Sequence, residues 1–269
     1  MKEKKIQNQA VPKDHPRYKS LKYRHKIIEG MKNLIVAEAG LIAHGRGECF
    51  DYILGEKTNK TAKKAIRAAV AQLLISNKPI ISVNGNIAAL TPKFLVKLSK
   101  ILNIPLEINL FYRKEGRIEA IKNLLEKEGA NAILGLDENK MVEIEELSSN
   151  RRLVDPNGIK IADTVFVPLE DGDRTEALKK IGKKVITVDL NPVSRTAVWA
   201  DITIVDNIIR VLPEMINIAK KLKTMKKEEL INIVNNFNNK KNLIDTLDLI
   251  KEYIEAQKKM LLKFEKNNY

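Results

Sequence analysis

Three short, nearly uninterrupted apolar runs between residues 163 and 207 constrain the fold of this chain more than any other feature. They cover residues 165–169, 185–188 and 202–205, and most of their side chains are β-branched. A continuous apolar strand, rather than one that alternates with polar residues, is typical of a parallel sheet with both faces covered. Polar residues follow each run, and in open parallel sheets ligands bind beyond the carboxyl ends of the strands. The pattern therefore predicts a parallel sheet with a ligand site at one edge.

The alternation of strand and helix extends toward the N-terminus. Further strands are predicted at residues 80–83, 106–110 and 132–136. Helices are predicted at residues 16–32, 60–76, 92–102 and 116–129, and again from residue 208 onward. Such alternation indicates an α/β fold. We expect a Rossmann-like open, mostly parallel sheet with helices on both faces and with helical N- and C-terminal extensions.

The simplest division of the chain is a single α/β domain spanning residues 1–269. Its expected parts are a loose tail (1–13), an N-terminal helical part (14–78), a βαβ core (79–209) and C-terminal helices (210–269). Residues 137–160 show no clear periodicity, which predicts an excursion on the surface. Pro213 predicts a kink or a restart early in the helix that follows the core.

An apolar stripe runs along the C-terminal helical region. Leu243, Leu247, Ile250 and Ile254 recur at spacings of four and three residues, as in coiled coils. Such a stripe packs either on its own domain or on a second subunit, and the pattern leaves both possibilities open.

The formal net charge of +14 raises the question of an acidic partner. A strongly basic chain is a candidate for nucleic-acid binding. Only 5% of the residues are aromatic, however, and no aromatic side chains interleave with basic ones as in a base-stacking surface. Lysine-rich solvated helices, or recognition of anionic small substrates, also account for the charge. Nucleic acid is therefore the less favoured partner.

The single cysteine, Cys49, excludes a disulfide within the chain. That usage suits a reducing, cytoplasmic compartment. No apolar run reaches the roughly 20 residues that span a bilayer, and the N-terminus has no apolar signal-peptide segment. We expect a cytoplasmic protein without membrane association, in which Cys49 is a small buried side chain.

Two common phosphate-binding motifs, GxxxxGK[ST] and GxGxxG, do not occur in this chain. The segment Gly45-Arg46-Gly47 is the most distinctive alternative. Flanking glycines let the backbone approach a ligand closely, and the arginine can bind a phosphate with two N–H groups. The simpler alternative is a turn with an exposed arginine. The neighbouring His44 is either a general acid or base or a structural residue.

Polar residues at the end of the strand at 185–188 suggest a nucleotide site. Asp189 stands where an acidic side chain accepts hydrogen bonds from ribose in mononucleotide-binding units, although it also suits a cap for the next helix. Asn191 and Arg195 lie at the start of that helix. Its free N–H groups and the arginine suit a triphosphate.

The remaining strand ends carry less specific polar residues. Asp171 and Asp173 are candidates for binding magnesium or an incoming amine, or they are simply favourable charges at a helix start. Asn84 and Asn86 follow the first strand. Their amides either contact a polar substrate or shape the turn.

Several longer strings, in order along the chain, resemble one enzyme family. They are HPRYKSLKYRHKIIEGM, AGLIAHGRGE-x-FDY, SVNGN-x-AAL, EINLFYR, PLEDGDRTEAL and DLNP-x-SR-x-A-x-x-ADITIVDN. Together they resemble the archaeal 4-phosphopantoate–β-alanine ligases, also called phosphopantothenate synthetases, from about Asp14 to beyond Asn207. The resemblance is weak at residues 137–153 and in the C-terminal helices.

The resemblance implies a homodimeric enzyme of coenzyme A biosynthesis. Such an enzyme joins 4-phosphopantoate to β-alanine with ATP and Mg²⁺, through an acyl-adenylate, and releases AMP and diphosphate. The family's ATP-contacting positions fall on Arg24, Arg46, Asp189, Leu190, Asn191, Arg195, Thr196, Asn207 and Ile208. The general base, the magnesium ligands and the pockets for the two acids remain unassigned.

Two alternatives to this function remain open. One is an ATP-dependent ligase or kinase that acts on another small acid. The other is a basic nucleic-acid-binding or scaffold protein without turnover, whose binding to RNA would weaken with salt.

Overall fold

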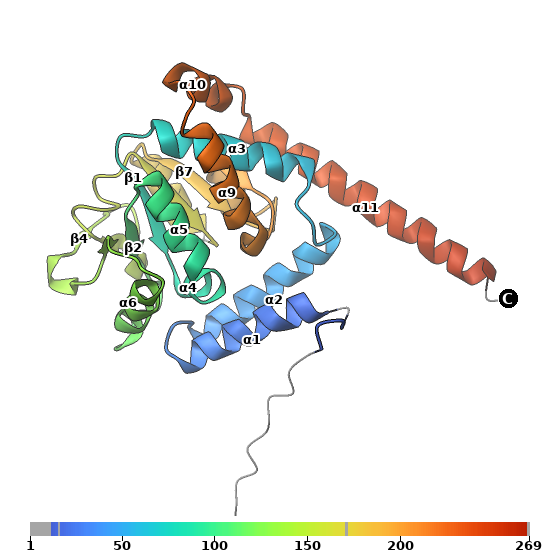
Figure 1. Cartoon of the computed structure of the whole chain (residues 1–269), viewed down its shortest axis with the longest axis horizontal. Coiled ribbons are helices and arrows are strands. Elements are labelled where there is room, and N and C mark those ends of the chain that lie inside the picture. Colours follow the sequence, from blue (N-terminus) through green and yellow to red (C-terminus); the bar gives the residue numbers. More distant parts are fainter. Residues whose placement is uncertain (1–11, 16, 170–171, 268–269) are drawn as a thin grey trace, which may run out of the picture.

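The computed structural model describes residues 12–15, 17–169 and 172–267, so most of the expected N-terminal tail lies outside it. Its centre is a sheet of six parallel strands (Figure 1). In spatial order they are β3 (Ile133–Leu134), β2 (Leu106–Ile108), β1 (Pro79–Val83), β6 (Thr164–Pro168), β7 (Lys184–Val188) and β8 (Ile202–Ile204). The six predicted strands are therefore confirmed, with ends that differ by one or two residues.

The strand order reverses direction between β1 and β6, which are paired in parallel with Ile80 beside Val165. The chain runs outward from β1 to β2 and β3, then returns and runs outward again through β6, β7 and β8. This is the order of a doubly wound Rossmann fold, and the crevice at such a reversal is where ligands bind. The expected α/β class is confirmed.

Four helices cover one face of the sheet. They are α3 (Lys60–Ile75), α5 (Pro92–Leu102), α6 (Arg117–Lys127) and α9 (Ile208–Leu222). Because successive strand residues point to opposite faces, Ile81 and Phe166 pack against these helices while Ile80 and Val165 face the other way. Helix α9 continues through Pro213 rather than restarting there, since its buried apolar side outweighs the local cost of proline.

The opposite face is covered by α7 (Gly172–Lys180) together with residues 137–160. The latter segment contains η1 (Glu138–Lys140), β4 (Val142–Glu143), η2 (Asn150–Arg152) and β5 (Leu153–Val154). Its Ile144, Leu147 and Ile159 are buried against the sheet, so the expected surface excursion is wrong. The short α7 leaves part of this face uncovered. Apolar side chains of residues 137–160 cover the remainder, and their spacing in the sequence follows neither a helical nor a strand period.

The N-terminal helices α1 (Tyr18–Lys32) and α2 (Glu38–Ile53) lie side by side below the sheet (Figure 1). Helix α2 includes Gly45 and Gly47, so the interpretation of this segment as a turn is wrong. Glycine disfavours a helix by about 1 kcal/mol per residue. Here a side chain at Gly40 would collide with Asn86, so the helix needs a small residue to lie this close to the core.

The C-terminal helices depart from the compact core. Helix α10 (Lys227–Asn235) packs on α3, whereas α11 (Asn239–Asn267) begins on the core and then projects away from it (Figure 1). Leu243 and Ile250 contact a small apolar cluster, but Leu247 and Ile254 are exposed. Over the described residues, every helix is too short or too polar to cross a membrane.

Candidate functional site

A cavity of about 370 Å³ lies where the strand order reverses. Residues that follow β1, β2, β6, β7 and β8 form its floor, and α2 forms its opposite wall. The predicted ligand site at the carboxyl ends of the strands therefore corresponds to a real pocket. The end near β7 and β8, where the sequence predicts a nucleotide, is lined by Leu190, Asn207 and Ile208 and is the nucleotide end. The end beyond β2 is lined by Arg117 and Arg151 and is the arginine end.

Asn84 links the loops that follow β1 and β6, where the strand order reverses. Its amide N–H groups donate to the carbonyls of Pro168 (3.0 Å) and Leu169 (3.1 Å), and its oxygen accepts from the N–H of Ile87 (3.1 Å) as the N-cap of α4 (Gly85–Leu90). Asn86 donates to the carbonyl of Gly40 at 2.8 Å. Asn84 therefore shapes the turn after β1, which was one of the two expected roles, and Asn86 ties that turn to α2.

Helix α2 crosses the crevice with Gly40 and Gly47 turned inward. A side chain at Gly47 would contact Leu190 at 3.4 Å, whereas one at Gly45 would meet open space. Arg46 lines the pocket and is exposed. Cys49 lies four residues beyond Gly45, on the same outward face, and is exposed, so the expectation that it is buried is wrong.

Asp189 is largely buried at the nucleotide end. Burial raises the pKa of this carboxyl, while hydrogen bonds from the Ser194 hydroxyl and the Asn191 N–H (2.9 Å) and the charge of Arg46 act in the opposite direction. Leu190 lines the pocket beside it. The carboxylate thus already organises the loop that leads into α8 (Arg195–Trp199), as the capping alternative predicts, and it remains close to the pocket.

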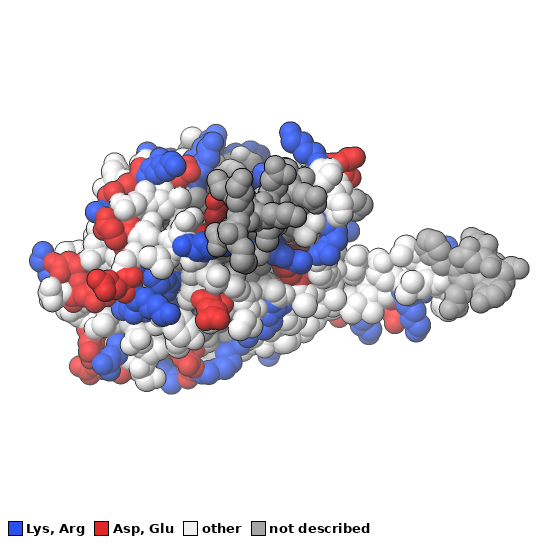
Figure 2. All heavy atoms as spheres, turned by 90° about the horizontal axis from the view of Figure 1, so that it is seen from below, with Lys and Arg blue, Asp and Glu red and all other residues white. Residues whose placement is uncertain are grey.

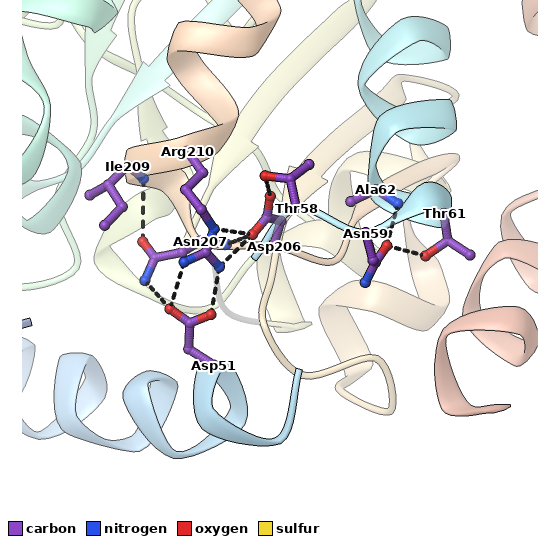
Figure 3. Close-up of polar contacts among 9 residues, drawn as sticks. All are labelled: Asp51, Thr58, Asn59, Thr61, Ala62, Asp206, Asn207, Ile209 and Arg210. Atoms are coloured by element: carbon purple, nitrogen blue, oxygen red, sulfur yellow. Dashed lines mark hydrogen bonds and ion pairs between the residues drawn. The ribbon is translucent and has the colours of Figure 1, made fainter. Parts of the chain in front are cut away.

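A group of buried and partly buried polar side chains lies behind the nucleotide end (Figure 3). Arg210 of α9 bonds Asp51 of α2 at 2.5 Å and Asp206 at 2.5 Å, and Asn207 donates to Asp51 at 2.8 Å. Burial acts to lower the pKa of Arg210, but the two carboxylates raise it above its ordinary value. The group fixes Asn207, whose own oxygen caps α9, and presents Asn207 and Ile208 to the pocket.

Of the nine predicted ATP-contacting residues, Arg46, Leu190, Asn207 and Ile208 line the cavity. The other five do not, namely Arg24, Asp189, Asn191, Arg195 and Thr196. Arg24 donates to Glu48, which does line it, at 2.9 Å. Exposed Arg195 bonds Asp173 (2.5 Å) and Glu176 (2.7 Å), whereas Thr196 is buried within α8. Asp171 lies outside the described residues.

The arginine end was not predicted from the sequence. Arg117, at the start of α6, and Arg151, in the segment that covers the far face, both line the cavity, and only 4% and 7% of their surfaces are exposed. Arg117 donates to the backbone carbonyls of Leu34, Ile35 and Tyr112, and burial lowers its pKa. The only available signal was the nearby string EINLFYR, which ends before either arginine.

The described carboxylates around the cavity do not form a metal cage. Within the described residues, no three His, Cys, Asp or Glu side chains gather closely enough to hold a metal ion. Magnesium in nucleotide enzymes is commonly bound by one or two carboxylates together with the substrate phosphates. The donor set is therefore compatible with an ion that is held largely by a nucleotide.

Known proteins resemble this chain over most of its length. The family described as phosphopantothenate/pantothenate synthetase matches residues 61–253. The 4-phosphopantoate–β-alanine ligase of Thermococcus kodakarensis is 56% identical over 238 residues, which cover 88% of this chain and 90% of that protein. The proteins of the same name from Methanosarcina mazei and Methanospirillum hungatei are 47% and 41% identical, over 91% and 90% of this chain and 96% and 97% of their own lengths.

Proposed function

The chain belongs to the phosphopantothenate/pantothenate synthetase family, and on that premise we propose that its pocket joins 4-phosphopantoate to β-alanine with ATP. The chain is a ligase of coenzyme A biosynthesis, and a ligase of this family implies the use of a nucleotide. One observation supports the specific reaction best. A single cavity spans the strand reversal and has basic side chains near both ends, as two anionic substrates require.

ATP occupies the nucleotide end in this proposal. Arg46, Leu190, Asn207 and Ile208 line that end, and Asp189 lies directly before Leu190. Asp189 is the candidate for the ribose hydroxyls. These positions were predicted from distant parts of the sequence, and their convergence on one cavity supports the assignment.

Arg24 and Arg195 would act at the margin of this end. Each is bound to carboxylates in the structure, Arg24 to Glu48 and Arg195 to Asp173 and Glu176. The side chains of Arg24 and Arg195 are 40% and 62% exposed, so each can exchange a carboxylate for a phosphate at little cost. Thr196 would contribute through the start of α8, beside Arg195.

The phosphoryl group of 4-phosphopantoate occupies the arginine end. Arg117 is a buried cation whose hydrogen-bond acceptors in the structure are backbone carbonyls rather than carboxylates. Carbonyl dipoles solvate the guanidinium but leave its full positive charge. A phosphate dianion beside it would gain a charge-assisted contact, and Arg151 would add a second cation.

This placement puts the carboxylate of the acid between its own phosphoryl group and ATP. The carboxylate attacks the α-phosphorus of ATP in line, forming an acyl-adenylate and releasing diphosphate. The β-alanine amine then attacks the acyl carbon and expels AMP. Arg46 stabilises the charge that develops on the phosphates, and Mg²⁺ bound to the triphosphate would supply further positive charge there.

We also propose that two copies of the chain associate through the projecting part of α11. Ile244, Leu247 and Ile254 are 41–49% exposed, and the visible side of the projection carries few charged groups (Figure 2). An exposed apolar stripe at heptad-like spacing is suited to a partner helix. The double variant Leu247→Glu/Ile254→Glu should sediment as a monomer in analytical ultracentrifugation. Lys251→Glu, which adds similar charge to the exposed side of α11, should leave the dimer intact; two monomeric variants would argue for a general charge effect.

The reaction is tested by measuring AMP release with each substrate omitted in turn. AMP should accumulate only when ATP, 4-phosphopantoate and β-alanine are all present. Formation of ADP instead would indicate a kinase-like or phosphate-transferring ligase and would overturn the adenylate route. Salt-sensitive RNA binding without nucleotide turnover would favour the non-enzymatic alternative.

A further inference from the structure

His44 is a polar residue in the pocket wall that the reaction described above does not yet use. It lies on α2 and lines the cavity. Its Nε2 atom is buried and has no hydrogen-bond partner in the structure. A buried polar atom without a partner is costly and uncommon in a folded protein. At a pocket wall, such an atom points to a ligand that completes its hydrogen bonding.

The position of His44 along α2 places it near the centre of the pocket. Gly40 lies against Asn86, which follows the central strand β1, and Gly47 lies against Leu190 at the nucleotide end. A helix rises about 1.5 Å per residue, so His44 lies over the middle of the crevice between these two contacts. This is where the acid's carboxylate and the α-phosphate of ATP would meet.

The charged groups around His44 favour a neutral imidazole. Burial, the largest influence, lowers the pKa of His44; Glu48, one turn along α2, acts to raise it, and Arg24 of α1 acts to lower it. Glu48 is itself bound by Arg24 at 2.9 Å, which weakens its pull on a proton. Arg46 and Arg117, which line the same cavity, are also cations. A neutral imidazole can accept a proton in the neutral pH range.

The second half of the reaction requires a proton acceptor at this place. When the neutral amine of β-alanine attacks the acyl-adenylate, a C–N bond forms and the acyl C–O bond to the AMP phosphate breaks. The electron pair leaves on AMP, and the nitrogen must lose one proton to become an amide. Within the described pocket, Glu48 is the other candidate acceptor, and it is held by Arg24.

We propose that Nε2 of His44 accepts this proton, and that the imidazolium releases it to water after the products have left the pocket. For that role the imidazole carries its hydrogen on Nδ1 and presents the Nε2 lone pair to the pocket. The inference depends on the proposed function, because it assigns the base of that reaction. It also separates the two half-reactions: His44 serves amide formation and is not required for formation of the acyl-adenylate.

The test is the variant His44→Gln, which keeps a polar atom near the position of Nε2 but cannot accept a proton. Adenylation is measured alone, as exchange of labelled diphosphate into ATP with 4-phosphopantoate and without β-alanine. Condensation is measured as AMP release with both acids over a range of pH. We expect exchange close to the wild-type rate and condensation slower by about 10²-fold, the usual contribution of a general base. The fall of the wild-type condensation rate at low pH should be absent from the variant.

His25→Gln is the matched control, because His25 is exposed on α1 and lies outside the pocket lining. It should leave both activities unchanged. The proposal is overturned if His44→Gln condenses at the wild-type rate with the wild-type pH profile. It is equally overturned if exchange and condensation fall together, since His44 would then serve adenylation or folding. A wild-type protein that neither exchanges diphosphate nor releases AMP would instead refute the proposed function itself.

Discussion

Two arginines, one at each end of the pocket, are withdrawn from solvent but are held in different ways. Arg210, beside the nucleotide end, bonds two carboxylates, those of Asp51 and Asp206 (Figure 3). Arg117, at the other end, bonds backbone carbonyls of three residues. Around Arg210 two negative charges exceed one positive charge, whereas Arg117 keeps its whole charge.

This difference gives Arg210 a structural role and underlies the binding role proposed for Arg117. Arg210 ties α2 to α9 and lies behind the pocket-lining residues Asn207 and Ile208. Its charge is compensated, so an incoming phosphate would gain little from it. Arg117 lines the cavity directly, and its charge is available to an anionic substrate. The proposed orientation of the two substrates follows from this contrast.

Removing Arg210 should have the largest effect on stability. Arg210→Ala leaves Asp51 and Asp206, with only 7% and 1% exposure, without their cation. Breaking one side of a buried ion pair typically costs roughly 3–5 kcal/mol, so we expect a loss of about 3 kcal/mol in unfolding free energy. Urea denaturation measures it, and Arg67→Ala, at an exposed position on α3, is the control. Equal losses in the two variants would show that Arg210 is not a structural tie.

Changing Arg117 should affect substrate binding selectively. Arg117→Gln removes the uncompensated charge, and we expect the KM for 4-phosphopantoate to rise by about 10²-fold, which corresponds to about 2.7 kcal/mol. The KM for ATP should change little, because the proposed ATP site lies at the other end. Steady-state kinetics with each substrate varied in turn gives both values.

The control for Arg117 is Arg113→Gln. Arg113 bonds Glu138 at 3.1 Å and lies outside the pocket lining. A thermal melt of each variant separates weak binding from unfolding. If Arg117→Gln raises both KM values equally, or leaves both unchanged, the assignment of the two ends is wrong.

Glu107 extends the comparison to a buried anion. It is fully buried on β2 and accepts backbone N–H groups of Ile159 (2.6 Å) and Asp155 (3.1 Å). Burial raises its pKa from 4.5 to about 7, although these N–H groups and the charge of Arg174 act in the opposite direction. Because the folded-state pKa is raised, its contribution to stability is fully present below pH 4.5 and is lost as the pH rises through 7.

Relative to Glu107→Gln, the wild-type protein should therefore lose roughly 3 kcal/mol of stability between pH 4.5 and pH 8. Denaturant unfolding of both proteins at several pH values measures the difference. Glu126→Gln, at an exposed position on α6, should show no such trend. If the unfolding free energy of the wild type instead rises relative to that of Glu107→Gln as the pH increases, the surrounding N–H groups and charges stabilise the ionised carboxylate more than burial disfavours it.

The smallest effect is expected at the exposed pair between Arg195 and Asp173. Each side chain is 62% exposed, so solvent screens their attraction. Asp173→Asn should leave the melting temperature unchanged within error and should not raise the KM for ATP. A clear fall in melting temperature would show that this surface pair contributes more to stability than its exposure suggests. The difference in stabilising effect between this pair and the ion pairs of Arg210 would then be smaller than we expect.

The sheet was predictable because its signals are local. The runs at 165–169, 185–188 and 202–205 are continuous and β-branched, and each lies within a residue or two of β6, β7 and β8. Leu190, Asn207 and Ile208, predicted at these strand ends, line the pocket for the same reason, since parallel strands bring their carboxyl ends to one edge. Residues 137–160 escaped prediction because their buried side chains follow the shape of the sheet face and have no period.

Helix α2, in contrast, could not be predicted from local sequence signals. Its sequence left open a phosphate-binding arginine between glycines or a turn with an exposed arginine, and the segment is a continuous helix. The deciding contacts are those of Gly40 with Asn86 and Gly47 with Leu190, residues that lie far away in the sequence. Only these contacts reveal that the glycines allow close packing and that His44 faces the pocket while Cys49 does not.

The sequence alone determined the α/β class, the order of strands and helices along the chain and the edge of the sheet at which the pocket lies, because periodicity and strand-end chemistry act over a few residues. The tertiary structure decided which charges meet. Arg210 and Asp51 are 159 residues apart in sequence but share two hydrogen bonds, and Arg117 reaches carbonyls 82 and 83 residues before it. Whether a buried arginine remains available to a substrate depends on such distant partners. That is a property of the packed chain and of the low dielectric within it.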